Sequence, residues 1–291
     1  PNAEHEPART LTMKFAQREN PMPEGDTLYK LAEYLSPRLV GRRLAEGVVR
    51  LPTATPLGGL RVDAVQALGK HLIIAFDNGR ILRSHLGMWG SWHCYGPDEP
   101  WRRPAREARI ELRVDGQVYV CFKPKEVELL RDLGLRHRLL AARLGPDLIQ
   151  GNADEAVILQ RAREILERDA PLVDLLLDQR VAAGIGNVYK SEVLFLERRH
   201  PLTPAGELDD VDLIELYRRA RTLLRANLGG GPRITRPKGQ DADRDRLWVY
   251  GRRGLACFGC STPIEAGRLG TAQRSTYWCP DCQPRGRGTL C

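Results

Sequence analysis

The first regular pattern of apolar positions begins after residue 22. Leu28, Leu31 and Leu35 recur at intervals of three and four, which places them on one face of a helix. Asp26 or Thr27 can cap the start of this helix, because their side-chain oxygens accept hydrogen bonds from its first free amides. Residues 1–22 are polar and have no sustained period, so we interpret them as a disordered extension.

Short apolar segments separated by turn residues come next. HLIIAF and RILRSHL flank Asp77-Asn78-Gly79, and ARIELRV and QVYVCF flank Asp115-Gly116. Asn-Gly and Asp-Gly adopt the positive φ angles that tight hairpin turns require. The pattern therefore predicts a mainly antiparallel β domain over residues 23–140.

From about residue 150 the apolar period becomes helical. Two stripes predict helices, one formed by Ile158, Ala162, Ile165 and Leu166, the other by Leu213, Leu216, Tyr217, Ala220 and Leu224. Gly229-Gly230-Gly231-Pro232 and a charged stretch up to Arg246 then interrupt the pattern. This interruption predicts a mobile linker over residues 229–246.

The net charge of the chain indicates a partner. Lysine and arginine outnumber the acidic residues 45 to 37, which gives a formal charge of +8 and an isoelectric point near 9.3. This balance favours a polyanion such as nucleic acid, the alternative being a basic protein without one. No stretch approaches the roughly 20 apolar residues of a membrane span, and no signal-peptide core is visible. We expect an intracellular monomer that binds no membrane.

Four of the seven cysteines form two pairs near the C-terminus. Cys257, Cys260, Cys279 and Cys282 follow the pattern C-x2-C-x18-C-x2-C, which can bring four thiolates to the corners of a tetrahedron around Zn²⁺. Four protein ligands leave no open position for water, so we predict one structural zinc ion. Cysteines paired by chance, or a redox pair, are the alternatives.

A glycine-rich turn separates two predicted helices in LLLDQRVAAGIGNVYKSEVLFLERRHP. Gly184 and Gly186 allow a ligand to approach the backbone closely, and the amides at the start of the following helix attract an anion. A DNA phosphate would fit there, although an ordinary corner in a helical bundle has the same pattern. Between the cysteine pairs, Arg274 is either a second phosphate contact near a hairpin tip or a solvated surface arginine.

Three stretches considered together change this assessment: Met22-Pro23-Glu24-Gly25-Asp26, AGIGNVYKSEVLF, and QRSTYWCPDCQ with its cysteines. In this order they resemble the signature of the formamidopyrimidine-DNA glycosylase and endonuclease VIII family, from about Pro23 to Gln283. The start PEGD resembles the endonuclease VIII branch. The resemblance implies an α+β multi-domain fold: an N-terminal catalytic β-sandwich with flanking helices (23–140), a helix-two-turn-helix DNA-binding domain (141–228), a linker (229–246) and a zinc-finger β-hairpin (247–291).

The resemblance also implies a reaction on damaged double-stranded DNA, with the damaged nucleotide flipped out of the duplex. The secondary amine of Pro23 would attack C1′, expel the base and form an iminium ion, after which elimination cuts the strand. Glu24 would transfer protons as a general acid–base, its alternative being a helix-capping acid. Lys70 would contact the phosphate beside the lesion, its alternative being a solvated lysine.

Further DNA contacts are implied by the same resemblance. Asn187 and Arg274 match the family's phosphate-binding asparagine and zinc-finger arginine. Met88 matches the side chain that fills the gap left by the flipped base, whereas a buried core methionine is the alternative. Lys190, in the glycine-rich motif, is assigned to DNA binding with them.

The chain departs from the family pattern at its start. Pro23 is not the first residue, and a proline nitrogen inside a chain is an amide that cannot form an iminium ion, so the full 291-residue chain should be inactive. Because Met22 directly precedes Pro23, we expect residues 1–22 to be an overextended start, an expression leader or a removable segment. Thr27 replaces a second acid that some members carry.

The substrate is indicated by another departure. Lys123-Pro124-Lys125-Glu126 stands where the 8-oxoguanine branch has an Arg-Arg-Phe loop, which favours oxidised pyrimidines and abasic sites. Two other functions are compatible with the sequence. A non-catalytic damaged-DNA-binding protein would have its proline blocked by the extension, and an RNA-associated zinc protein would carry a similar turn. Only the enzyme would form a covalent intermediate that borohydride reduces.

Overall fold

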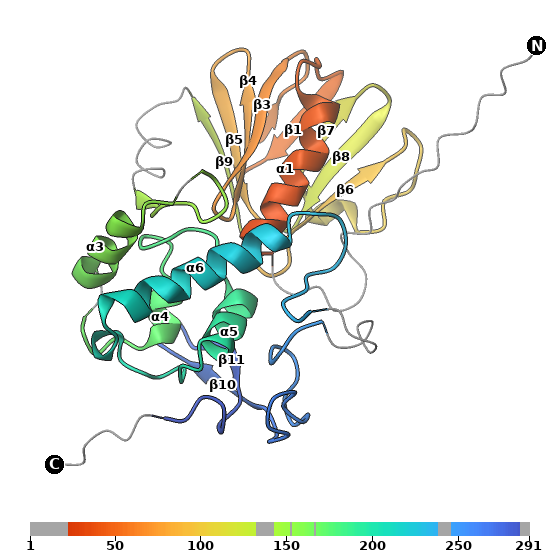
Figure 1. The fold of residues 1–291 in the computed structure, drawn as a ribbon. Helices are drawn as coiled ribbons and strands as arrows, with labels where there is room; N and C mark the ends of the chain where they lie inside the picture. Colours follow the sequence, from red (N-terminus) through yellow and green to blue (C-terminus); the bar gives the residue numbers. More distant parts are fainter. Residues whose placement is uncertain (1–22, 132–142, 152, 166, 238–245, 286–291) are drawn as a thin grey trace, which may run out of the picture.

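The computed structural model describes residues 23–131, 143–151, 153–165, 167–237 and 246–285. A β-sandwich with one long helix beside it forms the N-terminal part, and a group of helices with a small hairpin forms the rest (Figure 1). The extension at 1–22 and residues 238–245 of the expected linker lie outside the described residues.

Helix α1 (Gly25–Leu39) opens the fold. Its buried face carries Leu28, Leu31 and Leu35, as the spacing predicted, and it packs against the sheet strand that begins at Val62. The N-cap residue is Glu24, so the prediction of Asp26 as the cap is wrong, whereas Thr27 does take part in capping because its Oγ1 accepts Glu24 N–H at 3.4 Å. The side chain of Asp26 is free for another partner as a result.

Two antiparallel sheets form the sandwich. One has the order β2-β1-β7-β8-β6, and its strands are β1 (Glu46–Arg50), β2 (Ala54–Pro56), β6 (Ser91–Tyr95), β7 (Ala108–Val114) and β8 (Gln117–Phe122). The other has the order β3-β4-β5-β9, and its strands are β3 (Val62–Leu68), β4 (His71–Phe76), β5 (Arg80–His85) and β9 (Glu126–Arg131). Both predicted hairpins are confirmed as β4–β5 and β7–β8, with positive φ at Gly79, Asp115 and Gly116.

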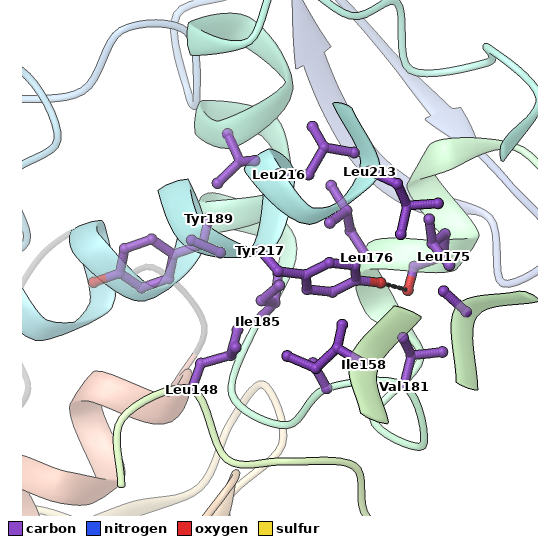
Figure 2. Packing of buried hydrophobic residues seen from close by; sticks show 14 of the residues in the cluster. Leu148, Ile158, Leu175, Leu176, Val181, Ile185, Tyr189, Leu213, Leu216 and Tyr217 are labelled. Carbon is purple, nitrogen blue, oxygen red and sulfur yellow. Dashed lines mark hydrogen bonds between the residues drawn. The ribbon is translucent and has the colours of Figure 1, made fainter. Parts of the chain in front are cut away.

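The helical part consists of α3 (Glu155–Ile165), α4 (Leu172–Leu177), α5 (Asn187–Leu196) and α6 (Asp210–Ala226), with short 3₁₀ turns at Ala205–Glu207 here and Ala105–Glu107 in the sandwich. Both predicted stripes lie in its core, apart from Leu166, which is outside the described residues. Figure 2 shows Tyr217 of α6 reaching α4, where its hydroxyl donates to Leu175 O at 3.4 Å. Residues 187–195 of α5 are all buried, which fixes the turn before it.

The C-terminal hairpin of β10 (Glu265–Leu269) and β11 (Arg274–Trp278) packs against α5. The described part of the predicted linker is bonded to both neighbouring parts, since Arg233 binds Asp26 of α1 and Thr235 binds Glu192 of α5. Among the described residues, no helix has the length and apolar character needed to cross a membrane.

Candidate active site

Segments far apart in the sequence meet at the start of α1. Gly25 N–H donates to Gly184 O at 3.0 Å, and a Cβ at Gly25 would lie 3.0 Å from Gly184 Cα. The turn before β4 reaches the same place, because a Cβ at Gly69 would lie 3.1 Å from Ala183 Cβ. Pro23, the turn that carries Lys70 and the glycine-rich turn are therefore neighbours.

The Glu24 carboxylate lies at the N-terminus of α5. Its Oε2 accepts N–H groups of Gly186 at 2.7 Å and Tyr189 at 3.3 Å, and its Oε1 accepts Val188 N–H at 2.7 Å. These amides have no partner within the helix, and the helix dipole favours a negative charge beside them. A Cβ at Gly186 would lie 2.5 Å from Glu24 Cδ, so glycine is needed there. Glu24 is thus the N-cap residue of α1, and its side chain binds the first amides of α5.

A buried ion pair lies beside this carboxylate. Arg233 Nε donates to Asp26 Oδ2 at 3.0 Å, and its Nη2 donates to Asp26 Oδ1 and, at 3.2 Å, to Thr27 Oγ1. Arg233 Nη1 lies 3.8 Å from Glu24 Oε1. Sequence reasoning missed this pair, because Arg233 stands 207 positions from Asp26 in a segment with the composition of a linker. No local pattern could have joined them.

Lys70 follows Gly69 at the start of β4 and is partly buried. Burial lowers the pKa of its ammonium to about 8; the charge of Glu24 opposes this shift, and those of Arg274 and Arg233 add to it. Asp147 anchors this turn: its Oδ2 accepts Gly69 N–H at 2.6 Å and the Tyr29 hydroxyl at 3.1 Å. A fully solvated lysine would have neither a lowered pKa nor a position in a turn that is anchored by another segment.

The loop after β5 begins at the same end of the sheet as Lys70, because His71, the first residue of β4, pairs with His85, the last residue of β5. On this loop Met88 is 54% exposed and Trp89 is 73% exposed. The buried-core alternative for Met88 is therefore wrong. Sequence reasoning did not single out Trp89, although a second bulky apolar residue between Gly87 and Gly90 was a visible signal.

The hairpin side of the site carries Arg274, which is exposed at the start of β11. Lys190 of α5 is fully buried, and its Nζ donates to Ser275 O at 3.0 Å and Thr276 Oγ1 at 2.8 Å. Burial lowers the pKa of Lys190 to about 7. The structure thus places Lys190 behind the strand of Arg274, where it attaches the hairpin to α5, and its role as a DNA contact stays a prediction. Asn187, 4% exposed, begins the same helix.

The four predicted metal ligands come together at the base of this hairpin. Their sulfur atoms all lie within 4.8 Å of one another, with separations of 3.8 Å for Cys257–Cys282, 3.4 Å for Cys260–Cys279 and 3.5 Å for Cys260–Cys282. Zn–S bonds of about 2.3 Å at tetrahedral angles separate the sulfurs by about 3.8 Å. The cluster can therefore hold a metal ion of this kind.

Comparisons with known proteins agree with this arrangement. Residues 22–126 match the formamidopyrimidine-DNA glycosylase N-terminal domain, and residues 144–237 match the formamidopyrimidine-DNA glycosylase H2TH domain. Endonuclease 8 2 of Mycobacterium bovis is 39% identical over 278 residues, which cover 90% of this chain and 100% of that protein. The DNA-(apurinic or apyrimidinic site) lyase Nei2 of Mycolicibacterium smegmatis is 37% identical over 265 residues, which cover 90% and 99%.

The fold is also that of a solved structure. Lactococcus lactis formamidopyrimidine-DNA glycosylase, bound non-covalently to DNA with an abasic site, superimposes with a TM-score of 0.75 at 23% identity and covers 90% of this chain and 100% of its own. The family domains account for both the sandwich and the helical part that meet at Glu24. This chain belongs to the formamidopyrimidine-DNA glycosylase and endonuclease 8 family.

Proposed function

We propose that this chain is a DNA glycosylase and abasic-site lyase of base-excision repair, acting on oxidised pyrimidines in double-stranded DNA. The observation that carries the proposal is the buried Glu24 carboxylate, held by three backbone amides of the helical part and directly following Pro23. Lys70 lies within electrostatic reach of this carboxylate. An amine, a carboxylate and an ammonium are the groups that the reaction needs.

The chemistry begins at the nitrogen of Pro23 once that nitrogen is a free secondary amine. Its lone pair forms a bond to C1′ while the bond from C1′ to the base breaks, and the departing base takes up a proton. The nitrogen then gives up its proton, the bond from C1′ to O4′ breaks as O4′ takes up a proton, and an iminium ion forms between Pro23 and C1′. Loss of a C2′ proton then breaks the bond to the 3′ phosphate oxygen, which cuts the strand. Glu24, as an anion, stabilises the cationic centre and accepts or returns protons.

The other site residues hold the DNA. The ammonium of Lys70 binds the phosphate beside the flipped nucleotide, and Asn187 and Arg274 bind further phosphates from the helical part and the hairpin. Met88 fills the space that the nucleotide leaves, because an exposed apolar side chain can replace the lost stacking. Lys190 supports Arg274 from behind through its bonds to Ser275 and Thr276.

The metal of the cysteine cluster is zinc in this proposal. Zn²⁺ bound by Cys257, Cys260, Cys279 and Cys282 would stabilise the hairpin and would take no part in the chemistry, because four thiolates complete its coordination. We expect one zinc ion per chain by metal analysis of the folded protein. Cys257→Ser should release it and weaken DNA binding, and a chain that folds and binds DNA without zinc would contradict this assignment.

The deciding experiment is borohydride trapping on a duplex with one abasic site. The full 291-residue chain is compared with a chain that begins at Pro23, and a third form with one glycine before Pro23 is the matched control. A covalent adduct from the Pro23 form alone is the expected result. If no form gives an adduct although all bind the duplex, the protein is a non-catalytic damaged-DNA-binding protein.

The preferred base is tested with the form that gives the adduct. Lys123, Pro124 and Lys125 are the whole connection between β8 and β9, and Lys125 N–H donates to His85 O at 2.8 Å behind the Met88 loop. This connection lacks the Arg-Arg-Phe sequence of the 8-oxoguanine branch, which is the ground on which we propose pyrimidine lesions. We expect faster release of an oxidised pyrimidine than of 8-oxoguanine from otherwise identical duplexes, and the reverse order would overturn the substrate assignment.

A further inference from the structure

We infer that Asp26 and Arg233 are positioning residues that hold Glu24 in place for the reaction. This inference rests on the proposed function. It assigns a role to a buried pair of which Asp26 lies in the N-terminal motif and Arg233 in none of the three motif stretches of the sequence. The pair joins two segments on either side of the helical part, the start of α1 and the chain that leaves α6.

The geometry ties the pair to Glu24. Two guanidinium nitrogens of Arg233 are used by Asp26, and one of these also donates to Thr27 Oγ1. The third, Nη1, is buried without a hydrogen-bond partner among the described residues and lies 3.8 Å from Glu24 Oε1. A buried donor without a hydrogen-bond partner is costly, and the ionic contact of Nη1 with Glu24 Oε1 offsets part of this cost. The guanidinium thus places its positive charge beside the Glu24 carboxylate.

Glu24 therefore faces two sets of donors. The amides of Gly186, Val188 and Tyr189 bind the carboxylate, and the guanidinium of Arg233, from the segment that follows α6, lies 3.8 Å from Oε1. All four donors come from groups whose own positions are fixed. A carboxylate next to the attacking amine must keep one orientation while positive charge develops, and fixed donors provide this without reorganisation.

The loop that carries Arg233 contacts both α1 and α5. Lys30 Nζ of α1 donates to Gly231 O at 3.3 Å, and the ring of Tyr189 of α5 lies 4.8 Å from the guanidinium carbon of Arg233. Asp26 and Arg233 are only 2% and 7% exposed. The side chain of Asp26 is available for this contact because Glu24, and not Asp26, caps α1.

The test compares variants that separate position from folding. Arg233→Gln leaves a buried, unpaired Asp26 and can fail to fold, so the informative variant is the double change Asp26→Asn with Arg233→Gln, whose amides can bond to each other. Arg233→Lys keeps the charge but cannot reach both acids. Arg218→Gln, on the exposed side of α6 where Arg218 pairs with Glu155, is the control. Each is made in whichever form of the chain gives the adduct.

The measurements are thermal unfolding, affinity for the abasic-site duplex, and single-turnover rates of adduct formation and base release. For the double variant we expect normal unfolding and affinity with rates reduced about 10- to 100-fold, below the loss of a direct transition-state donor. Arg233→Lys should recover part of the rate. Rates equal to those of the unchanged chain in a folded double variant would overturn the inference.

Should the double variant fail to fold, Arg233→Lys decides alone: a reduced rate at unchanged affinity supports positioning, and an unchanged rate rejects it. These outcomes are distinct from failure of the proposed function, in which the unchanged chain itself would give no adduct.

Discussion

The Glu24 carboxylate has only acceptors to offer, and the groups around it are all donors. Three amides of the α5 N-terminus bind it, and Arg233 Nη1 lies 3.8 Å from its Oε1. A side chain with the same shape but mixed donors and acceptors cannot satisfy this environment. Charge and hydrogen bonding therefore favour glutamate at this position independently of its proposed role in proton transfer.

Glu24→Gln is expected to lower the single-turnover rate of base release by about 10²- to 10⁴-fold, the range for loss of a general acid–base. Its amide also turns an N–H₂ group toward backbone N–H donors, which should reduce stability by about 1–3 kcal/mol. Glu33→Gln, on the exposed side of α1, is the matched control and should change neither quantity. A base-release rate within twofold of the unchanged chain would remove Glu24 from the mechanism.

Lys70 predicts a pH dependence of DNA binding. Because burial lowers its pKa to about 8, the ammonium is mostly charged at pH 7 and loses its charge as the pH rises through about 8. A solvated lysine would keep the charge to about pH 10.4. Affinity for an abasic-site duplex, measured by fluorescence anisotropy at constant ionic strength, should therefore fall between pH 7 and pH 9.

Lys70→Arg is the control for this pH dependence, since a guanidinium stays charged over the whole range. The fall in affinity should disappear in this variant. Lys190 also has a lowered pKa, but its nitrogen faces Ser275 and Thr276 inside the protein. An unchanged fall in Lys70→Arg would show that another group is responsible.

At the scale of the element, α5 connects all three parts of the chain. Its first amides bind Glu24 of the sandwich side, and Lys190 binds the hairpin strand β11. Two residues further along, the Glu192 carboxylate accepts the N–H groups of Trp248, Val249 and Tyr250 at 2.8, 2.9 and 2.8 Å, together with the Thr235 hydroxyl. Glu192 is fully buried. The helix thus binds both the Glu24 carboxylate and the chain before the cysteine cluster through backbone amides.

Glu192→Gln should therefore loosen the hairpin end of the molecule. Its amide cannot accept all three backbone N–H groups, and we expect a loss of about 1–3 kcal/mol in unfolding free energy. Hydrogen exchange should speed up first at residues 248–250. Glu164→Gln, at an exposed carboxylate that accepts from Gln160 Nε2 on α3, is the matched control and should leave exchange at 248–250 unchanged. Uniformly faster exchange throughout the chain would contradict a local role.

The elements themselves were largely predictable from the sequence, but α5 shows the limit. The hairpins β4–β5 and β7–β8 and the buried stripe of α6 follow from local periodicity and turn residues, and the structure confirms them. Lys190 and Glu192 have the composition of a solvent-exposed face, yet both are fully buried. Their partners lie 43 to 86 positions away, so local pattern could not reveal that these charges are satisfied inside the protein.

At the scale of the whole molecule, the residues expected to touch DNA come from three different parts: Lys70 from the sandwich, Asn187 from the helical part and Arg274 from the hairpin. The family motifs predicted each of these residues. Arg233 could not be predicted, because its role depends on how the chain leaving α6 returns to α1. Lys70 and Arg274 are charged and Asn187 is neutral, so the electrostatic contribution of each residue to DNA binding can be measured separately.

The dependence of affinity on salt separates these contacts. Each phosphate neutralised by a cation adds about 0.9 to the slope of log K against log salt concentration, because counterions are released from the DNA. Arg274→Gln and Lys70→Met should each reduce the slope by about 0.9. Asn187→Ala should weaken binding at every salt concentration without changing the slope, since its side chain carries no charge. Arg218→Gln, on the exposed side of α6, should change neither slope nor affinity. A slope change for Asn187→Ala, or none for Arg274→Gln, would mean that the phosphates follow a different path across the three parts.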